Sequence, residues 1–262
     1  MLAIERRNMI LESLQRDGRV VVSELSQHYG VSEETIRRDL DRLEKDGFAI
    51  KTYGGAVINE NNNVDLPFTI RKNANIAAKQ KIAELLAEQI HDGDHIMLDA
   101  SSTAVFVARS IKNKKNITLI TNSVEILVEL ADVVGWRIFS TGGSLREGSL
   151  ALVGPQAERM LASFHVDMAV ISCKGIDEIR GFSESNEMHA QTKKCMLESA
   201  FQKVLAIDST KFDKISFTQI GSLKDLTAVV TDKEPEERWK QIFTAAGVSC
   251  RYPEGVVEKE EE

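Results

Sequence analysis

The hydrophobic positions of the first 58 residues repeat with the spacing of three short helices. The first helix, over about residues 4–17, is expected to bury four apolar side chains: Ile4, Ile10, Leu11 and Leu14. Ser23 is positioned to cap the second helix, which Gly30 ends, and Ser32 to cap the third. A turn this short makes the third helix cross the second steeply, as in a helix-turn-helix that enters a DNA major groove.

The third helix separates a buried face from a polar face. At roughly 100° per residue, Ile36, Leu40 and Leu43 share the side that faces the core. Polar side chains on the rest of this helix, and shortly after it, are the candidates for DNA contact: Ser32, Glu34, Thr35, Arg37, Arg38, Lys51 and Tyr53. Arginine suits this role because it donates paired hydrogen bonds to guanine or to a phosphate. The alternative is an ordinary three-helix unit with a solvated charged face.

Two short strand patterns follow this helix, over residues 48–53 and 56–58. Between them, Gly54 and Gly55 are expected to supply the positive φ angles of a hairpin turn. A hairpin directly after a recognition helix forms a wing, which would bring a cation and hydroxyl groups beside the phosphate backbone.

A polar stretch without core residues begins at Asn59 and marks a domain boundary. We expect a winged helix-turn-helix domain over residues 1–58, a linker over 59–73, a second domain over 74–254 and an acidic tail over 255–262. In the second domain, hydrophobic strand patterns alternate with helical patterns. This alternation predicts an α/β, Rossmann-like fold with a mainly parallel sheet, whose ligands bind beyond the carboxyl ends of the strands.

Polar residues collect where these strands end. Asp99 ends the first strand, and the residues after it open a helix. Hydroxyls and backbone N–H groups at this helix start, from Ser101, Ser102 and Thr103, suit a phosphate, although helix capping alone is the simpler interpretation. Similar clusters follow the later strands: Asn122; Gly142 with Gly143; Lys174 with Gly175; Glu187 with Lys193; and Lys211. Their recurrence at one sheet edge favours a ligand site.

Composition narrows the classes of function. Residues 1–58 contain nine Lys/Arg and ten Asp/Glu, and the whole chain has a net charge of −7. DNA binding would therefore depend on locally placed arginines and on paired heads, and histone-like or anionic-membrane binding is disfavoured. The three cysteines lack paired spacing and the five histidines form no metal-binding motif. We predict a cytoplasmic protein with no membrane span, metal or other cofactor.

Several sequence motifs occur together in one order. The head contains ERR at 5–7, VSEETIRRDLDRLEKDG and YGGAV, and the body contains LDASST, TNS, TGGSLR, LVGP, KGID and DSTKF. With these motifs, the chain closely resembles the DeoR family of bacterial transcriptional regulators from about Glu5 to Asp232. The resemblance implies a small α+β winged helix-turn-helix head, followed by an α/β sugar-phosphate sensor body similar to ribose-5-phosphate isomerase.

The resemblance also implies roles for the strand-end residues. It makes Ser101, Ser102 and Thr103 a phosphate loop, Asp99 and Asn122 partners of sugar hydroxyls, Gly142 and Gly143 a close-approach turn, and Lys174, Glu187, Lys193 and Lys211 a charged rim. The expected function is repression of a carbohydrate-metabolism operon. In this function a homo-oligomer, a dimer or tetramer, binds double-stranded operator DNA under the control of a phosphorylated sugar.

Two alternatives belong to other functional classes. One is an active sugar-phosphate isomerase-like enzyme with a DNA-binding head, for which Asp177, Glu184 and Glu187 are candidate carboxylate bases. The other is a constitutive DNA-binding protein whose body serves only for oligomerisation.

Overall fold

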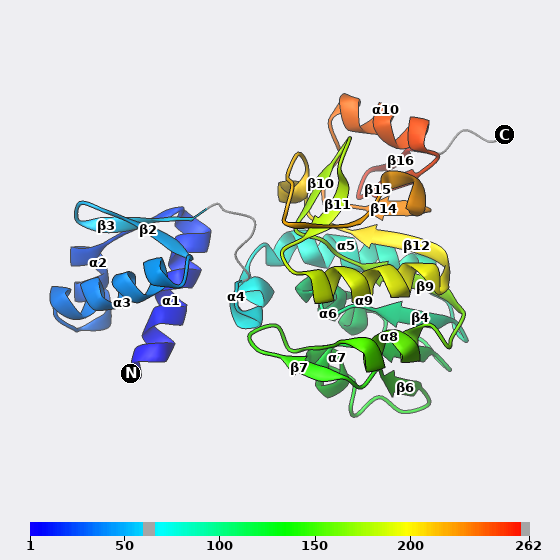
Figure 1. The fold of residues 1–262 in the computed structure, drawn as a ribbon, viewed down its shortest axis with the longest axis horizontal. Coiled ribbons are helices and arrows are strands. Elements are labelled where there is room, and N and C mark those ends of the chain that lie inside the picture. Colours follow the sequence, from blue (N-terminus) through cyan, green and yellow to red (C-terminus); the bar gives the residue numbers. More distant parts are fainter. Residues whose placement is uncertain (60–65, 258–262) are drawn as a thin grey trace. The chain divides into compact units, whose positions relative to one another are not determined.

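The computed structural model describes residues 1–59 and 66–257. The chain forms two compact units, Met1–Ala74 and Asn75–Glu262, which we call the head and the body (Figure 1). The head contains, in chain order, α1 (Ala3–Asp17), β1 (Arg19–Val21), α2 (Val22–Tyr29), α3 (Glu33–Lys45), β2 (Ala49–Thr52), β3 (Gly55–Ile58) and α4 (Phe68–Asn73). Its three strands form an antiparallel sheet in the order β1-β3-β2, which together with α1 to α3 makes a winged helix-turn-helix.

The helix signals of the head are mostly confirmed. The hydroxyl of Ser32 accepts a hydrogen bond from the N–H of Thr35 at the start of α3, and Gly30 ends α2 in the left-handed region. Ser23 is not the cap of α2, because β1 runs directly into this helix, which begins at Val22.

The expected core of α1 holds with one exception. Ile10, Leu11 and Leu14 are buried, but Ile4 is 61% exposed. Arg6 has the buried position in this first turn instead, and its Nε donates to the buried carboxylate of Asp39 over 2.5 Å.

The hairpin forms between β2 and β3, but its two glycines have different roles. Gly54 has a φ of 89°, as predicted for the turn. Gly55 does not have a positive φ, so that part of the prediction is wrong. A Cβ at Gly55 would lie 2.1 Å from the carbonyl oxygen of Val20, and glycine is therefore required because β1 and β3 approach closely there.

The predicted domain limits differ from the structure at two places. Helix α4 lies inside the segment expected to be a linker, and its Ile70 is fully buried in the hydrophobic core of the head. Residues 60–65 of that segment lie outside the described residues. At the other end, β16 (Gly255–Val257) pairs with β15 (Ser249–Tyr252), so these three residues belong to the body and not to a tail. Residues 258–262 of the predicted tail also lie outside the described residues.

The body is built around an eight-stranded sheet in the order β16-β15-β14-β12-β9-β4-β5-β6. Its remaining strands are β4 (His95–Leu98), β5 (Thr118–Thr121), β6 (Arg137–Ser140), β9 (Val166–Ile171), β12 (Ala200–Ala206) and β14 (Ala228–Val230). All neighbouring pairs are parallel except β15 with β16. The predicted α/β fold with a mainly parallel sheet is confirmed.

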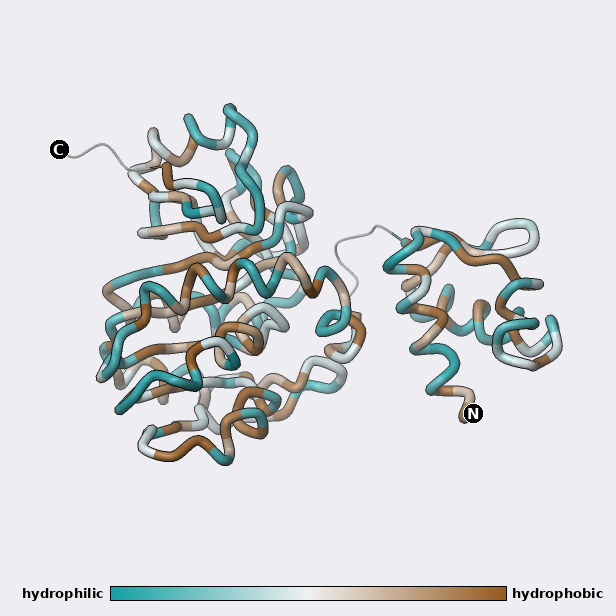
Figure 2. The backbone as a smooth tube through the Cα atoms, turned by 180° about the vertical axis from the view of Figure 1, so that it is seen from behind, coloured by the Kyte–Doolittle hydropathy of each residue, from teal (hydrophilic) through white to brown (hydrophobic). Residues whose placement is uncertain are grey.

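Helices cover both faces of this sheet. They are α5 (Ile76–Gln89), α6 (Ser102–Ser110), α7 (Val124–Glu129), α8 (Pro155–Leu161), α9 (Glu187–Glu198) and α10 (Glu237–Ala246), with short 3₁₀ turns η1 (Ser209–Lys211) and η2 (Leu223–Asp225). Figure 1 shows α8 and α9 on one face, and α5 and α6 on the other. The central strands are hydrophobic along most of their length, as expected for strands buried on both sides (Figure 2). No helix of the described part of the chain is long and apolar enough to span a bilayer.

Two small antiparallel structures lie beside the main sheet. One is the sheet β10-β11-β13, formed by β10 (Gly175–Asp177), β11 (Gly181–Glu184) and β13 (Thr218–Gly221). The other is the hairpin of β7 (Ser144–Arg146) and β8 (Ala151–Val153). The sequence pattern did not predict either of them, and both supply residues to the site at the carboxyl edge of the main sheet.

Candidate functional site

Helix α3 presents two charged pairs on its exposed side. Arg37 lies 2.6 Å from Glu33 and Arg38 lies 3.3 Å from Glu34, each four residues along the helix. Exposed pairs of this kind contribute only about 0.3–0.5 kcal/mol. A phosphate group therefore competes readily with these carboxylates for both arginines.

The other predicted DNA contacts lie at the start of α3 and on the hairpin. The hydroxyl oxygens of Ser32 and Thr35 are 2.9 Å apart. The hydroxyl of Ser32 also caps α3 by accepting a hydrogen bond from the N–H of Thr35. Lys51 on β2 forms an ion pair with Asp41 of α3, which fixes the hairpin against the helix. Tyr53, next to the turn glycine, is fully exposed. An aromatic ring that buries nothing in the head is available for a partner.

In the body, Asp99 joins the ends of two neighbouring strands. Its carboxylate accepts hydrogen bonds from the N–H of Ser101 and from the N–H of Ser172, each over 3.0 Å. Ser172 directly follows β9, and Asp99 directly follows β4. Asp99 is almost completely buried. Its two oxygens therefore hold the backbone of the site in place, in addition to any contact with a ligand.

Lys193 of α9 reaches the same place from the covering helix. Its Nζ donates to the carbonyl oxygen of Ser172 over 2.8 Å, forms a short ion pair with Glu184 and lies 3.5 Å from Asp99. Burial favours the neutral form of Glu184, but the ammonium groups of Lys193 and Lys174 outweigh this effect and lower the pKa of its carboxyl. The opposing charges of Glu184 and Asp99 likewise outweigh burial and raise the pKa of Lys193. The three side chains form a buried, ionised cluster, which we call the internal ion cluster.

The segment after Asp99 combines a capping residue with two further hydroxyls. The hydroxyl of Ser101 accepts a hydrogen bond from the N–H of Ala104 over 3.1 Å and caps α6. Within the described residues, the hydroxyls of Ser102 and Thr103 have no hydrogen-bond partner, although both residues are buried. Their N–H groups occupy the first two positions of α6 and have no intrahelical acceptor. These hydroxyl and N–H groups suit a bound anion.

A second charged group stands at the end of β12. The carboxylate of Asp208 accepts from the N–H of Thr210 over 3.1 Å and from Nδ2 of Asn75 over 3.4 Å. Burial raises the pKa of this carboxyl, but the charge of Lys211, the hydrogen bonds of Thr210 and the charge of Lys79 together lower it. Lys211 therefore lies at the carboxyl edge of the sheet, as predicted from its place after the strand.

Asn122 and its neighbours are enclosed by the β7–β8 hairpin. Nδ2 of Asn122 donates to the carbonyl oxygen of Leu152 over 3.0 Å, and its Oδ1 is buried with no partner within the described residues. An unpaired buried oxygen costs about 1–3 kcal/mol. A hydroxyl donor from a ligand would satisfy it.

Two of the three glycines predicted at the effector site closely approach other parts of the chain. Gly142 and Gly143 both have positive φ angles, and a Cβ at Gly143 would lie 2.6 Å from the carbonyl oxygen of Val153. A Cβ at Gly175 would lie 2.3 Å from the carbonyl oxygen of Lys214. The positive φ of Gly142 and the close approaches at Gly143 and Gly175 explain these glycines without a ligand.

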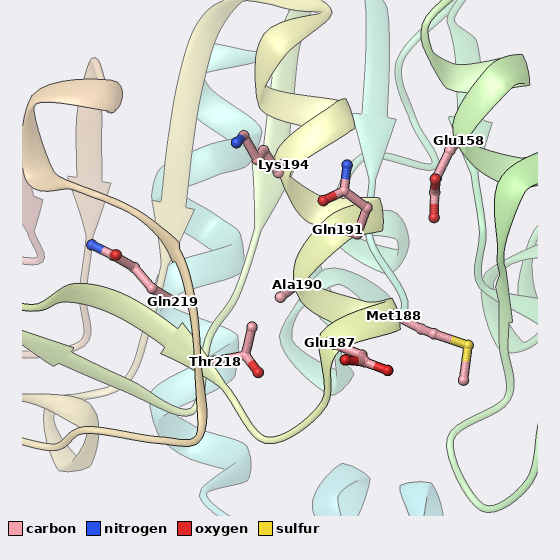
Figure 3. Close-up of a pocket in the computed structure, with 8 residues that line it drawn as sticks. All are labelled: Glu158, Glu187, Met188, Ala190, Gln191, Lys194, Thr218 and Gln219. Carbon is pink, nitrogen blue, oxygen red and sulfur yellow. The ribbon is translucent and has the colours of Figure 1, made fainter.

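Glu187 lies apart from the internal ion cluster. It is six residues before Lys193 on α9, so at roughly 100° per residue the two side chains leave different sides of the helix. Glu187 is exposed and lines a surface pocket of about 330 Å³ together with Glu158, Met188, Ala190, Gln191, Lys194, Thr218 and Gln219 (Figure 3). None of the other predicted effector residues lines this pocket.

Two acidic residues of the site were not among the predicted effector contacts. Glu184 stands on β11, a strand that the sequence pattern did not reveal, and was considered only as a base for the enzyme alternative. Asp208 lies in the DSTK motif that contributed Lys211. A signal for Asp208 was therefore available, because a strand-end aspartate of the same kind was assigned at Asp99.

Comparisons with known proteins agree with this two-part architecture. The DeoR-like helix-turn-helix domain matches residues 6–62, and the DeoR C terminal sensor domain matches residues 74–233. The uncharacterized HTH-type transcriptional regulator YulB of Bacillus subtilis is 40% identical over 88% of this chain and 90% of its own length. The L-fucose operon activator of Haemophilus influenzae is 35% identical over 87% of this chain and 91% of its own length. The glycerol-3-phosphate regulon repressor of Escherichia coli is 30% identical over 93% and 96%, respectively.

Solved structures are similar only at a distance. Ribose 5-phosphate isomerase A of Methanocaldococcus jannaschii is 19% identical, with a TM-score of 0.37 over 51% of this chain and 53% of that chain. The delta subunit of eIF2B from Chaetomium thermophilum is 16% identical, with a TM-score of 0.46 over 62% and 57%, respectively. These values are too low to support an argument about function. Because the two domain matches span both units, in the order in which the structure has them, this chain belongs to the DeoR family of transcriptional regulators.

Proposed function

We propose that this protein is a DNA-binding repressor of a carbohydrate-metabolism operon whose affinity for its operator is controlled by a phosphorylated sugar bound in the body. The observation that carries the proposal is the first turn of α6, where the hydroxyls of two largely buried residues, Ser102 and Thr103, and the helix N-terminus lie at the edge of the sheet where charged residues follow the strands. Relatives named as the L-fucose operon activator and the glycerol-3-phosphate regulon repressor support the link with carbohydrate metabolism, and the second name includes a phosphorylated compound.

In the head, α3 is the proposed recognition helix. Arg38 and Glu34 are exposed on the side opposite the buried Ile36, and Arg37 stands beside them. Ser32, Thr35, Lys51 and Tyr53 complete the proposed DNA contacts. Arg6 has no such role, because its guanidinium is buried against Asp39.

In the body, Ser102 and Thr103 are the proposed phosphate contacts, with Ser101 as the cap that holds their helix. Asn122 and Asp99 would accept hydrogen bonds from sugar hydroxyls, and Lys174 and Lys211 would supply positive charge. Lys193 holds the internal ion cluster together, since its ammonium already faces Ser172, Glu184 and Asp99. Gly142, Gly143 and Gly175 shape the surrounding chain, and Glu187 lies outside this set.

The enzyme alternative is disfavoured by the state of its carboxylates. A general base works best when its pKa is near the operating pH. The pKa of Glu184 is lowered instead, and Asp177 accepts hydrogen bonds from the N–H groups of Ile179 and Arg180 in a turn. Membership of a family of transcriptional regulators points the same way.

The DNA-binding part of the proposal is tested with the promoter region of the protein's own operon. Arg38→Ala should weaken binding by about 1–3 kcal/mol per half-site contact. Fluorescence anisotropy with labelled DNA measures the change, and Arg16→Ala, an exposed arginine of α1, is the matched control. Equal affinity of the Arg38 variant and the native protein would contradict the recognition-helix assignment.

The effector part is tested by a thermal-shift panel of phosphorylated sugars. A ligand at about 100 times its dissociation constant stabilises the protein by about 2.7 kcal/mol. This corresponds to about 5–11 °C for a domain of this size. If no sugar phosphate raises the midpoint and DNA still binds, the protein is a constitutive DNA-binding protein whose body only oligomerises.

A further inference from the structure

Lys79 is a buried cation of the body that is not among the effector contacts proposed above. It stands on the second turn of α5 and its side chain is only 4% exposed. Taking an ammonium group out of water costs several kcal/mol unless opposite charge compensates it. Its described neighbours show where in the body this charge acts.

One neighbour of Lys79 is the helix that opens the proposed phosphate site. Helix α5 packs against α6, and Nζ of Lys79 lies 6.0 Å from the centre of the Phe106 ring. Phe106 follows Ser102 by four positions, so both leave the same face of α6. Long side chains on a helix lean toward its N-terminus. The ammonium group of Lys79 therefore lies beside a side chain that shares one face of α6 with Ser102.

A second described neighbour of Lys79 is Asp208, which follows the end of β12. The charge of Lys79 acts on the carboxylate of Asp208, which also faces Lys211. Asp208 is hydrogen-bonded to Asn75, four residues before Lys79. The charge of Lys79 thus acts on Asp208, and its ammonium group also faces the helix that begins with Ser102 and Thr103.

The negative charge of a phosphate group is larger than the positive charge that the start of α6 alone supplies. A phosphate monoester carries about −1.5 to −2 charges near neutral pH. The N-terminus of a helix supplies the equivalent of about half a positive charge. Lys193 is committed to Glu184 and Asp99. A cation beside α6 would add to the positive charge that Lys174 and Lys211 supply in the proposed site, and would strengthen the binding of such a group.

We propose that Lys79 binds the phosphate group of the effector together with Ser102 and Thr103. This inference rests on the proposed function and adds a residue to the same site. It also connects the site with the head through the chain itself: Lys79 belongs to α5, and only Ala74 and Asn75 separate the end of α4, in the head, from the start of α5. A phosphate bound by Lys79 therefore contacts the helix that directly follows the DNA-binding unit.

The experiment compares four full-length proteins, with inorganic phosphate as the probe. They are the native protein, Lys79→Met, Ser102→Asp and Lys81→Met, in which Lys81 is an exposed lysine of the same helix. Thermal midpoints are measured against phosphate concentration. Lys79→Met should weaken phosphate binding by at least about tenfold, as expected for the loss of a hydrogen bond to a charged group. Lys81→Met should bind phosphate like the native protein.

The outcomes separate the inference from the proposed function. If Ser102→Asp abolishes the phosphate response and Lys79→Met keeps it, the inference is wrong and the site stands. If the native protein responds neither to phosphate nor to sugar phosphates, the proposed effector control fails and the inference fails with it. If Lys79→Met does not fold by circular dichroism, Lys79→Gln and Lys79→Arg take its place. Loss of phosphate binding in the first and retention in the second would support the inference, and equal affinity in both would contradict it.

Discussion

Replacing Glu184 with glutamine tests the internal ion cluster. The substitution keeps the shape of the side chain but removes the charge that pairs with the buried ammonium group of Lys193. Breaking a buried ion pair by removing one partner typically costs about 3–5 kcal/mol. Asp99 remains 3.5 Å from Lys193 and still compensates part of its charge, so we expect about 3 kcal/mol. For a domain of this size, that lowers the thermal midpoint by about 6–12 °C.

The pH dependence of this loss follows from the two shifted pKa values. The folded protein lowers the pKa of Glu184, so its contribution is present above the unfolded value, about 4.3, and disappears as the pH falls through the folded value. The folded protein raises the pKa of Lys193. The contribution of Lys193 to stability is therefore present below its unfolded pKa, about 10.4, and disappears as the pH rises through its folded pKa. The difference between native protein and variant should therefore be constant between about pH 5 and 10 and should shrink below about pH 4.

Calorimetry on the full chain measures these differences, because the unfolding of the body can be followed separately from that of the head. Glu198→Gln is the matched control, because Glu198 is an exposed carboxylate on α9, the helix that carries Lys193. The double variant Glu184→Gln/Lys193→Met should recover about 1–3 kcal/mol, since it removes the uncompensated ammonium group as well. Strictly additive losses, or a loss below about 0.5 kcal/mol in the single variant, would refute the buried pair.

Two further predictions concern the head. Ile70→Ala should lower the stability of the head by about 2–4 kcal/mol in urea unfolding, because Ile70 is fully buried in its core; an unchanged midpoint would mean that α4 is part of a linker after all. Gly55→Ala should destabilise the head by about 1–3 kcal/mol, because its Cβ would lie 2.1 Å from the carbonyl oxygen of Val20, and native-like stability would show that β1 and β3 do not meet so closely.

The sequence predicted those parts of the head that depend on local signals. Ser32 and Gly30 mark helix ends through their own side-chain and backbone chemistry, and the structure confirms both. Helix α4 was missed because it has only six residues and is stabilised by packing against α1, which lies far away in the sequence, with Ile70 in the core of the head. The requirement for glycine at position 55 also arises from β1, a three-residue strand with no recognisable pattern.

In the body, all parallel strands of the main sheet except β15 were predicted from their hydrophobic runs, and polar residues that follow these strands lie at one edge of the sheet. The antiparallel sheet β10-β11-β13 was not predicted, because β13 pairs with a strand more than thirty residues earlier. Glu184 was consequently missed as the partner of Lys193. The helical period of α9 was available in the sequence and would have separated Glu187 from Lys193.

The central claim, that a phosphorylated sugar in the body controls DNA binding, is tested most directly by titrating the effector into the protein–DNA complex. The measurement is fluorescence anisotropy of labelled operator DNA, with the sugar phosphate that gives the largest thermal shift. The native protein should change its operator affinity by about fivefold to a hundredfold. Ser102→Asp places a carboxylate where the phosphate would bind, at a helix N-terminus that accepts negative charge. This variant should bind operator DNA normally and lose the response, whereas an unchanged effector midpoint in Ser102→Asp would contradict the proposed phosphate site.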